Sequence, residues 1–315
     1  METSPIYQYT VQAELWQRVE KNSIMLQSIQ PVMTVYADGH RPTVMKNSKP
    51  TMAIDDNTES IVYRPTQTAE TMDLDFYKSG WVYTNEDIRD LHMQESEVSQ
   101  INAITHTFGD LLNIQSLVRV AASIDFDGKY KDHVIPWNAS VTMANEPDTI
   151  TGIRPFQMSY AINKFYSVTR HNYMADDVFC VAPFEAKAFF TTEQFNEAQK
   201  NQQQNAYNDS AFLMKMYGMN FVFMPASVFE TAGCFNNNID GANHKGYYAY
   251  VFARESFVAC TLGQAGGDGQ NRSLLTFEPL PVSEKYRRGI ICRGNFGAMN
   301  AFPEHVMRID FRIQH

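Results

Sequence analysis

The chain has few cysteines, and none of them has the spacing of a metal site or a disulfide framework. Its 315 residues contain only Cys180, Cys234, Cys260 and Cys292, and no two of these form a C-x-x-C motif. Zinc knuckles and small disulfide-stapled domains depend on closely spaced cysteines, so the sequence indicates neither. The N-terminus also lacks the basic and apolar regions of a secretion signal, which predicts a reduced, intracellular protein.

Positive charge is also scarce. The chain has 26 Lys and Arg against 35 Asp and Glu, which gives a net charge of −9. Proteins that wrap or read nucleic acid bind phosphate through clustered Lys and Arg, so this balance argues against such a role. A chain of this kind can still form a wall beside DNA without adhering to it. No apolar run reaches the roughly 20 residues that a membrane-spanning helix needs, so we expect no membrane partner.

Recognisable catalytic and ligand-binding motifs are missing. The eight histidines form neither H-x-H nor H-E-x-x-H pairs, which argues against a metal site. The stretch GQAGGDGQ, residues 263–270, lacks the Lys-Ser/Thr that completes a phosphate-binding loop. The carboxylate pairs Asp55/Asp56 and Asp176/Asp177 stand beside turn signals and are typical of exposed caps. We therefore predict no catalytic, metal or cofactor-binding residues and no enzymatic activity.

Cys180 is the one residue that suggests catalysis. It lies in the stretch DDVFCVAPFEAKAFF, where an apolar β-type run meets Pro183 and a helix-like run follows. Nucleophiles often occupy strand–turn–helix joints, but a cysteine nucleophile also needs a base and an orienting group. His171 is near in sequence but lies across a turn, and no protease signature surrounds Cys180. We interpret Cys180 as a small apolar strand residue, with a Cys-dependent hydrolase as the alternative.

The patterns that are present predict an α+β fold. Apolar residues at spacings of three and four predict one long helix over Ser96–Ser123, about 40 Å in length. The stretch GQAGGDGQNRS predicts a flexible loop, and GYYAYVFARESFVACTLG predicts either a strand pair or one bent strand. Shorter patterns predict a second helix at 156–168, a helix after Pro183 to about 198, and strands at 72–85, 178–181 and 221–224.

A polar β-hairpin is predicted over residues 34–72. This segment is rich in Thr, Pro, Asp and Asn, with short apolar runs and a turn-forming DDNT at its tip. A long two-stranded ribbon is marginal in isolation, because it cannot bury both of its faces. The hairpin must therefore lie on another surface, either of this chain or of a second one.

The order of these elements resembles the major capsid proteins of tailed bacteriophages, which have the HK97-like shell fold. The resemblance covers most of the chain, from about Val35 to Phe311, and is one of pattern without a diagnostic short motif. VYADGHRP and IVYRPTQTAE resemble the extended loop, and SEVSQINAITHTFGDLLNIQSLVRVAAS resembles the spine helix. FQMSYAINKFYSV followed by DDVFCVAPFEAKAFF resembles the opening of the axial domain. The resemblance implies an N-terminal arm at 1–33, an extended loop at 34–72, a peripheral domain at 73–150 and 273–315, and an axial domain at 151–272.

The resemblance also implies a function and partners. It implies a structural protein that assembles into pentamers and hexamers of an icosahedral head around double-stranded DNA, in the host cytoplasm and then the virion. A separate scaffolding protein and a portal are implied partners, because only about 33 residues precede the hairpin. The basic hairpin residues Arg41, Lys46, Lys49 and Arg64 are the implied contacts with acidic neighbouring subunits, with solvated loop charge as the alternative reading. An encapsulin-type compartment shell and a viral accessory or tail protein remain alternatives.

Overall fold

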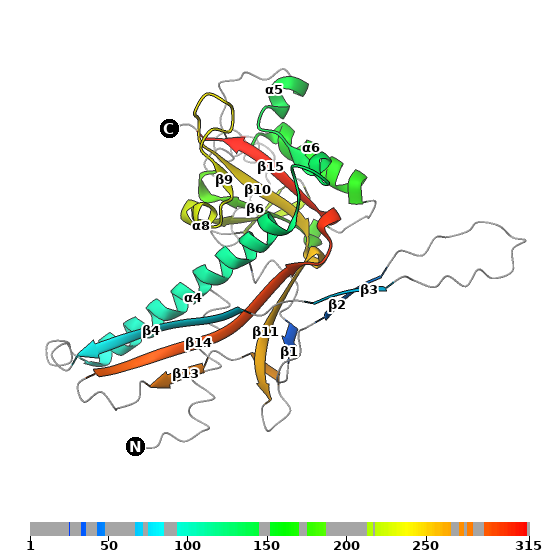
Figure 1. Ribbon diagram of the computed structural model, residues 1–315. Coiled ribbons are helices and arrows are strands. Elements are labelled where there is room, and N and C mark those ends of the chain that lie inside the picture. The colour runs from blue at the N-terminus through cyan, green and yellow to red at the C-terminus, as the bar shows by residue number, and fades with distance from the viewer. Residues whose placement is uncertain are drawn as a thin grey trace, which may run out of the picture.

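The computed structural model has an α+β architecture with two β-sheets, one long helix and a separate hairpin (Figure 1). The shorter helices and one of the two sheets lie at one end of the molecule (Figure 1). The long helix runs with three strands toward the other end (Figure 1). The structure describes residues 25, 33–35, 43–47, 67–71, 75–84, 93–144, 152–169, 175–186, 213–216, 218–265, 271–273, 276–279 and 287–313. The predicted α+β class is confirmed.

A seven-stranded sheet forms the centre of the larger core. Its strand order is β5-β15-β10-β6-β8-β7, and β9 pairs with β10. The inner strands β6, β8 and β10 are buried on both faces, which explains why they appear in the sequence as nearly continuous apolar runs. The strands are β5 (Val134–Ile135), β6 (Val178–Pro183), β7 (Leu213–Met216), β8 (Met219–Met224), β9 (Phe235–Asn236), β10 (Gly246–Ala253) and β15 (Val306–Arg312). The predicted strands at 178–181 and 221–224 are confirmed.

The second sheet has six strands and is organised around the 14-residue strand β14. β14 pairs with β11 through its last residues and with β4 and β13 through its earlier ones. The β4–β14 ladder runs without a break from Asp75 opposite Phe296 to Thr84 opposite Arg287. The strands are β1 (Met33–Val35), β4 (Asp75–Thr84), β11 (Phe257–Ala265), β12 (Asn271–Ser273), β13 (Thr276–Pro279) and β14 (Arg287–Asn300). The predicted strand at 72–85 is confirmed as β4.

The predicted long helix is confirmed as α4, Met93–Ser123, which begins three residues before the predicted start and ends where predicted. α4 lies along β4 and β14, and its buried stripe includes Phe108, Leu112, Leu117 and Val120 (Figure 1). Of the predicted N-terminal arm, 1–33, the structure describes only Met25 and Met33. Met25 is fully buried, and its N–H donates to Oδ1 of Asn113 on α4 at 3.1 Å.

Three shorter helices cover the seven-stranded sheet and its ends. They are α5 (Ala139–Ala144), α6 (Pro155–Thr169) and α8 (Ala226–Thr231). α6 confirms the predicted helix at 156–168, whereas α5 is a helix that the sequence patterns did not predict. Of the helix predicted after Pro183, the structure describes only residues 184–186, which are helical. A turn at Gly218 precedes β8, with a φ of 75° that favours glycine.

Two of the connections between the sheets lie at adjacent positions. β10 leads into β11 through Arg254–Ser256, and β14 leads into β15 through residues 301–305. The stretch predicted as a strand pair or a bent strand is therefore two strands in different sheets. Ser256 joins the two connections, because its Oγ donates to the carbonyl oxygen of His305 at 3.1 Å and its carbonyl oxygen accepts from Ala301 N–H at 2.7 Å.

Replacing Ser256 with alanine is expected to lower the free energy of unfolding by about 1–2 kcal/mol, because the buried carbonyl of His305 loses its donor. Urea denaturation followed by circular dichroism measures the change. The control is Ser227→Ala at an exposed position of α8, which we expect to change stability by no more than about 0.5 kcal/mol. Equal stabilities of the two variants would contradict this role of Ser256.

The predicted hairpin is confirmed at its base. β2 (Thr43–Asn47) and β3 (Gln67–Thr71) form an antiparallel two-stranded sheet, and among the described strands they pair only with each other. The predicted tip, Asp55–Thr58, lies outside the described residues.

The prediction of a flexible loop at GQAGGDGQNRS is wrong at both ends, because Gly263–Ala265 of β11 pairs with Asn271–Ser273, which is β12. The two ends of this stretch form an antiparallel pair of strands, although their glycines suggested an irregular loop.

The division into a peripheral and an axial domain stays a prediction. Strands of the two sheets alternate along the chain. β11 lies within 151–272 and pairs with β14, whereas β15 lies within 273–315 and pairs with β10. Each sheet is therefore completed by strands from both sides of the predicted boundary at residue 272.

Candidate assembly surfaces

The basic residues predicted to contact other subunits are placed only in part. Lys46 lies in β2, where its backbone pairs with Thr68 of β3. Arg41, Lys49 and Arg64 lie outside the described residues. The base of the hairpin projects from the side of the molecule that is away from the outer end of α4 (Figure 1). Contact between these four side chains and another subunit stays a prediction.

The structure places Cys180 in the interior of the seven-stranded sheet. It pairs with Val251 of β10 on one side and Phe221 of β8 on the other, and its side chain is fully buried. Desolvation raises the pKa of the thiol far above its ordinary value, so the nucleophilic thiolate is strongly disfavoured. The position supports Cys180 as a core residue and argues against the alternative of a hydrolase built around it.

Iodoacetamide is expected to leave Cys180 unmodified in the native protein and to modify it fully in 6 M guanidinium chloride. The reagent requires a thiolate and access to it, and burial removes both. Peptide mass spectrometry after timed labelling measures the extent at each cysteine. Rapid labelling of native Cys180 would contradict its assignment to the core.

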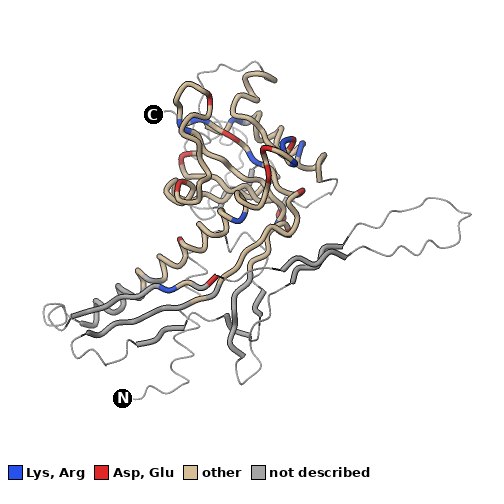
Figure 2. The backbone as a smooth tube through the Cα atoms, in the orientation of Figure 1, with Lys and Arg blue, Asp and Glu red and all other residues tan. Residues whose placement is uncertain are grey.

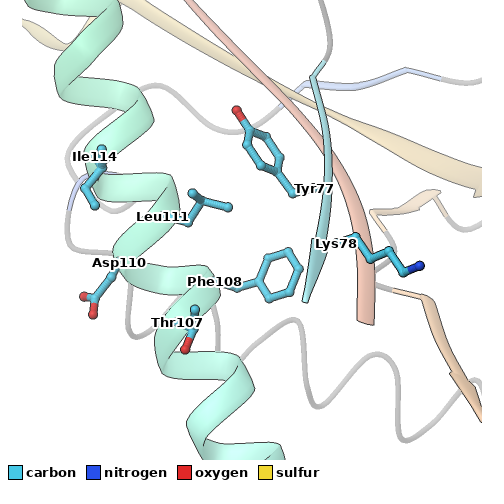
Figure 3. A pocket seen from close by; sticks show the side chains of 7 residues that line it. All are labelled: Tyr77, Lys78, Thr107, Phe108, Asp110, Leu111 and Ile114. Atoms are coloured by element: carbon cyan, nitrogen blue, oxygen red, sulfur yellow. The ribbon is translucent and has the colours of Figure 1, made fainter. Parts of the chain in front are cut away.

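A cavity of about 410 Å³ opens between α4 and β4 (Figure 3). Its walls are mainly apolar, with Phe108 and Leu111 of α4 pointing toward Tyr77 of β4 (Figure 3). Asp110 and Lys78 contribute to its border but point away from it on opposite sides (Figure 3). The cavity can accept apolar side chains, and its lining residues include no paired acid and base groups that would suggest catalysis.

An ion pair between Arg119 and Asp75 joins α4 to β4 at one end of this cavity. Arg119 Nη2 of α4 lies 3.0 Å from Asp75 Oδ2 of β4, and the Tyr77 hydroxyl donates to the same oxygen at 3.3 Å. Burial, together with the negative charge of Asp75, raises the pKa of Tyr77 to about 12. Both charged side chains are about half exposed, so the pair positions the helix on the strand and contributes little to stability.

A second polar cluster organises the exposed loop between β9 and β10. Arg312 Nη1 of β15 donates to Asp240 Oδ2 at 2.9 Å, and Nδ1 of His244 lies 2.5 Å from the same oxygen. The Asp240 side chain is only 3% exposed. Burial alone would raise its pKa, but the hydrogen bonds from Arg312, His244 and the Ala242 N–H hold the pKa well below its usual range. The Arg312 guanidinium also stacks over Trp137, 5.0 Å from the ring centre.

A neighbouring cluster at the base of the same loop consists of Lys245, Glu230 and Tyr247. Lys245 forms an ion pair with Glu230 of α8, and the Tyr247 hydroxyl donates to Glu230 Oε1 at 2.6 Å. Lys245 Nζ also lies over the rings of Phe235 and Tyr247, at 5.4 and 5.3 Å from their centres. Burial and the hydrogen bond to Glu230 raise the pKa of Tyr247 to about 12.

Asp310 is a buried carboxyl group on the face of β15 that also carries Arg308. Arg308 Nε lies 2.9 Å from Asp310 Oδ1, but neither atom makes a well-directed hydrogen bond, and the bond from Nη2 to Oδ2 is long, at 3.4 Å. Burial outweighs the attraction of Arg308 and raises the pKa of Asp310 to about 6. Arg308 is held over the Tyr248 ring, 4.5 Å from its centre.

Stability is expected to fall as pH rises from about 4 to about 6, and Asp310→Asn is expected to reduce this fall. In that window the folded carboxyl keeps its proton while the unfolded one, with a pKa near 3.9, loses it. The difference between the two stability curves should be on the order of 2 kcal/mol. Urea unfolding at half-unit pH steps measures both curves. Parallel curves across this window would contradict the assignment.

Metal and membrane sites are not found in the part of the chain that the structure describes. No group of three or more His, Cys, Asp or Glu side chains among these residues is arranged to hold a metal ion. No described helix is long and apolar enough to cross a bilayer.

Comparison with known proteins gives one consistent result. No family model matches the chain, and no curated protein matches it in sequence. The capsid of Ralstonia phage GP4 matches with a TM-score of 0.66 and 12% identity, over 91% of this chain and 88% of the other. The cyanophage Pam1 capsid matches with a TM-score of 0.63 and 11% identity, over 93% and 92%. The capsid of cyanophage P-SCSP1u matches with a TM-score of 0.53 and 13% identity, over 88% and 85%.

The chain therefore has the fold of phage capsid proteins, as the order of its sequence elements predicted. Sequence reasoning missed the cluster around Asp240. A usable signal was present in the spacing of Asn236, Asn238 and Asp240, followed by Gly241, because Asn and Asp at alternate positions before a glycine are typical of self-bonded turns. The partner Arg312 has no local signal, since it lies 72 residues away.

Proposed function

We propose that this chain is the major structural protein of a phage head. The observation that carries the proposal is the likeness to the Ralstonia phage GP4 capsid over about nine tenths of both chains. Copies of the chain would assemble into pentamers and hexamers of an icosahedral shell around double-stranded DNA. The protein would assemble in the host cytoplasm and reside in the virion.

The form of the molecule supports this role. α4 would serve as the spine helix, with the six-stranded sheet in the peripheral domain and the seven-stranded sheet in the axial domain. The hairpin base forms a sheet of its own, which suits a segment that lies on a neighbouring subunit. Contacts that repeat from one copy to the next around a ring generate closed assemblies of identical subunits.

Partners and charge are part of the same proposal. A separate scaffolding protein and a portal would direct assembly, and DNA would be enclosed by proximity without sequence reading. The net charge of −9 suits an inner wall to which DNA does not adhere. The basic hairpin residues Arg41, Lys46, Lys49 and Arg64 would face acidic groups of the next subunit, each pair contributing about 0–1 kcal/mol.

The function is structural and needs no catalytic residue. Size-exclusion chromatography with negative-stain microscopy of the full chain, expressed alone and with a scaffolding protein, tests it. We expect rings of five and six subunits or closed particles, and Cys180→Ala should assemble equally well. Particles that contain DNA after packaging would distinguish a phage head from an enzyme-filled compartment. A 36.0 kDa monomer under every condition would overturn the proposal.

A further inference from the structure

β15 carries three charged side chains on one face, Arg308, Asp310 and Arg312. Because side chains two residues apart in a strand lie on the same face, they form a row with a carboxyl group between two guanidinium groups. Figure 2 shows blue and red segments along this strand. Arg312 is paired with Asp240, which also contacts His244. Arg308 is therefore the cation that compensates Asp310.

Arg308 lies between two carboxyl groups and completes a bidentate pair with neither. Its Nε is 2.9 Å from Asp310 Oδ1, but neither atom makes a well-directed hydrogen bond, and the bond from Nη2 to Oδ2 is 3.4 Å long. Nη2 also lies 4.0 Å from Oδ1 of Asp127. A full arginine–carboxylate pair has two short, parallel bonds. The two carboxyl groups differ in their surroundings, because the Asp310 side chain is 13% exposed and that of Asp127 is 95% exposed.

Aromatic rings hold the guanidinium within reach of both carboxyl groups. Its central carbon lies 4.5 Å from the ring centre of Tyr248 and 5.3 Å from that of Phe126. Phe126 is buried in the core, 6.1 Å from the ring centre of Tyr250, and it fixes the turn of residues 125–130 that follows α4. Asp127 is the next residue in this turn, so a change of partner by Arg308 acts on the turn directly.

The ionisable groups packed around this pair come from three parts of the chain. They are Tyr248 and Tyr250 of β10, Cys234 before β9, and Asp125, Asp127 and Lys129 of the turn. Burial raises the pKa of both tyrosines above its usual value and that of Cys234 to about 11, so these groups stay neutral from pH 5 to pH 8. Burial raises the pKa of Asp310 to about 6, and the charge of Asp127 adds to this rise.

We propose that Arg308 changes partner with pH, pairing with Asp310 when that carboxyl group is ionised and with Asp127 when it is protonated. A neutral Asp310 no longer attracts the cation, whereas exposed aspartates are still ionised at pH 5. Low pH then holds the turn of residues 125–130 against β15, and neutral pH releases it. This conformational device lies within one chain, so it goes beyond the proposed function and does not depend on assembly.

The test measures what Asp127 contributes to stability at two pH values. Asp127→Asn removes the charge of an exposed side chain and keeps its size. We expect it to raise the equilibrium constant of unfolding about threefold at pH 5 and less than about 1.5-fold at pH 8. Urea unfolding of the full chain at low salt, followed by circular dichroism, measures both values. In the Asp310→Asn background, where a neutral amide replaces the protonated carboxyl group, the threefold effect should appear at both pH values.

The matched control is Asp132→Asn, the same change at an exposed position five residues further along. It corrects for the general effect of removing one negative charge from an acidic chain, and we expect the same small effect at both pH values. If Asp127→Asn and Asp132→Asn have equal effects at pH 5, the inference is overturned. This comparison also decides the question if Asp310→Asn does not fold, and neither result bears on the proposed function.

Discussion

Replacing Asp240 with alanine is expected to destabilise the protein by about 2–3 kcal/mol. The change leaves the Arg312 guanidinium nearly buried without its carboxylate, and it removes the acceptor of the Ala242 N–H. Loss of one partner from a fully buried pair costs about 3–5 kcal/mol, and this pair lies directly beneath a surface loop, where solvent offsets part of the cost. Guanidinium denaturation followed by tryptophan fluorescence measures the change.

The double variant Asp240→Asn with Arg312→Gln separates charge from shape. It keeps polar groups of similar size and removes both charges, so it should be more stable than Asp240→Ala. Asp127→Ala is the matched control, because the Asp127 side chain is 95% exposed. A loss of less than about 0.5 kcal/mol in Asp240→Ala, equal to that of the control, would contradict the role assigned to the pair.

Removal of the hairpin is expected to abolish assembly without unfolding the chain. Thr43 and Thr71 are paired at its base, so a two-residue Gly-containing turn can join the strands there and replace the residues between them. Among the described strands β2 and β3 pair only with each other, so the two main sheets keep their hydrogen bonds. Circular dichroism should show the fold, and sedimentation velocity should show only monomer.

A milder variant of the hairpin provides the comparison. Changing Arg41, Lys46, Lys49 and Arg64 to glutamine removes the four positive charges and leaves the strands in place. Because exposed ion pairs contribute only about 0–1 kcal/mol each, we expect a partial, salt-dependent loss of assembly. Normal particles from the shortened chain would show that the hairpin is not part of the contact between subunits.

Local periodicity was sufficient to predict the helices α4 and α6 and the buried strands β6 and β8. The three-and-four spacing from Val98 to Ala121 predicted α4, because its apolar side chains pack against β14, α8 and β4. The apolar run at 178–181 predicted β6, because a strand buried on both faces has no polar alternation. These features depend only on residues close together in sequence. Their order along the chain was sufficient to indicate the resemblance to capsid proteins.

The features that sequence reasoning missed depend on distant residues. The passage of β10 into β11 cannot be predicted locally, because it follows from pairing with β15 and β14, whose partner residues lie 35–66 positions further along. The segment after Gly263, expected to be a flexible loop, is instead a paired strand because β11 continues beyond its pairing with β14 and pairs with β12. The cluster of Asp240 and Arg312 forms only when β15 pairs beside the loop that precedes β10.

Electron cryomicroscopy of the full chain, purified alone and after coexpression with a candidate scaffolding protein, tests the central claim most directly. The account predicts closed icosahedral particles built from rings of five and six copies, with each hairpin on a neighbouring copy. Separate monomers, or fibres and small rings that never close into a shell, would contradict it.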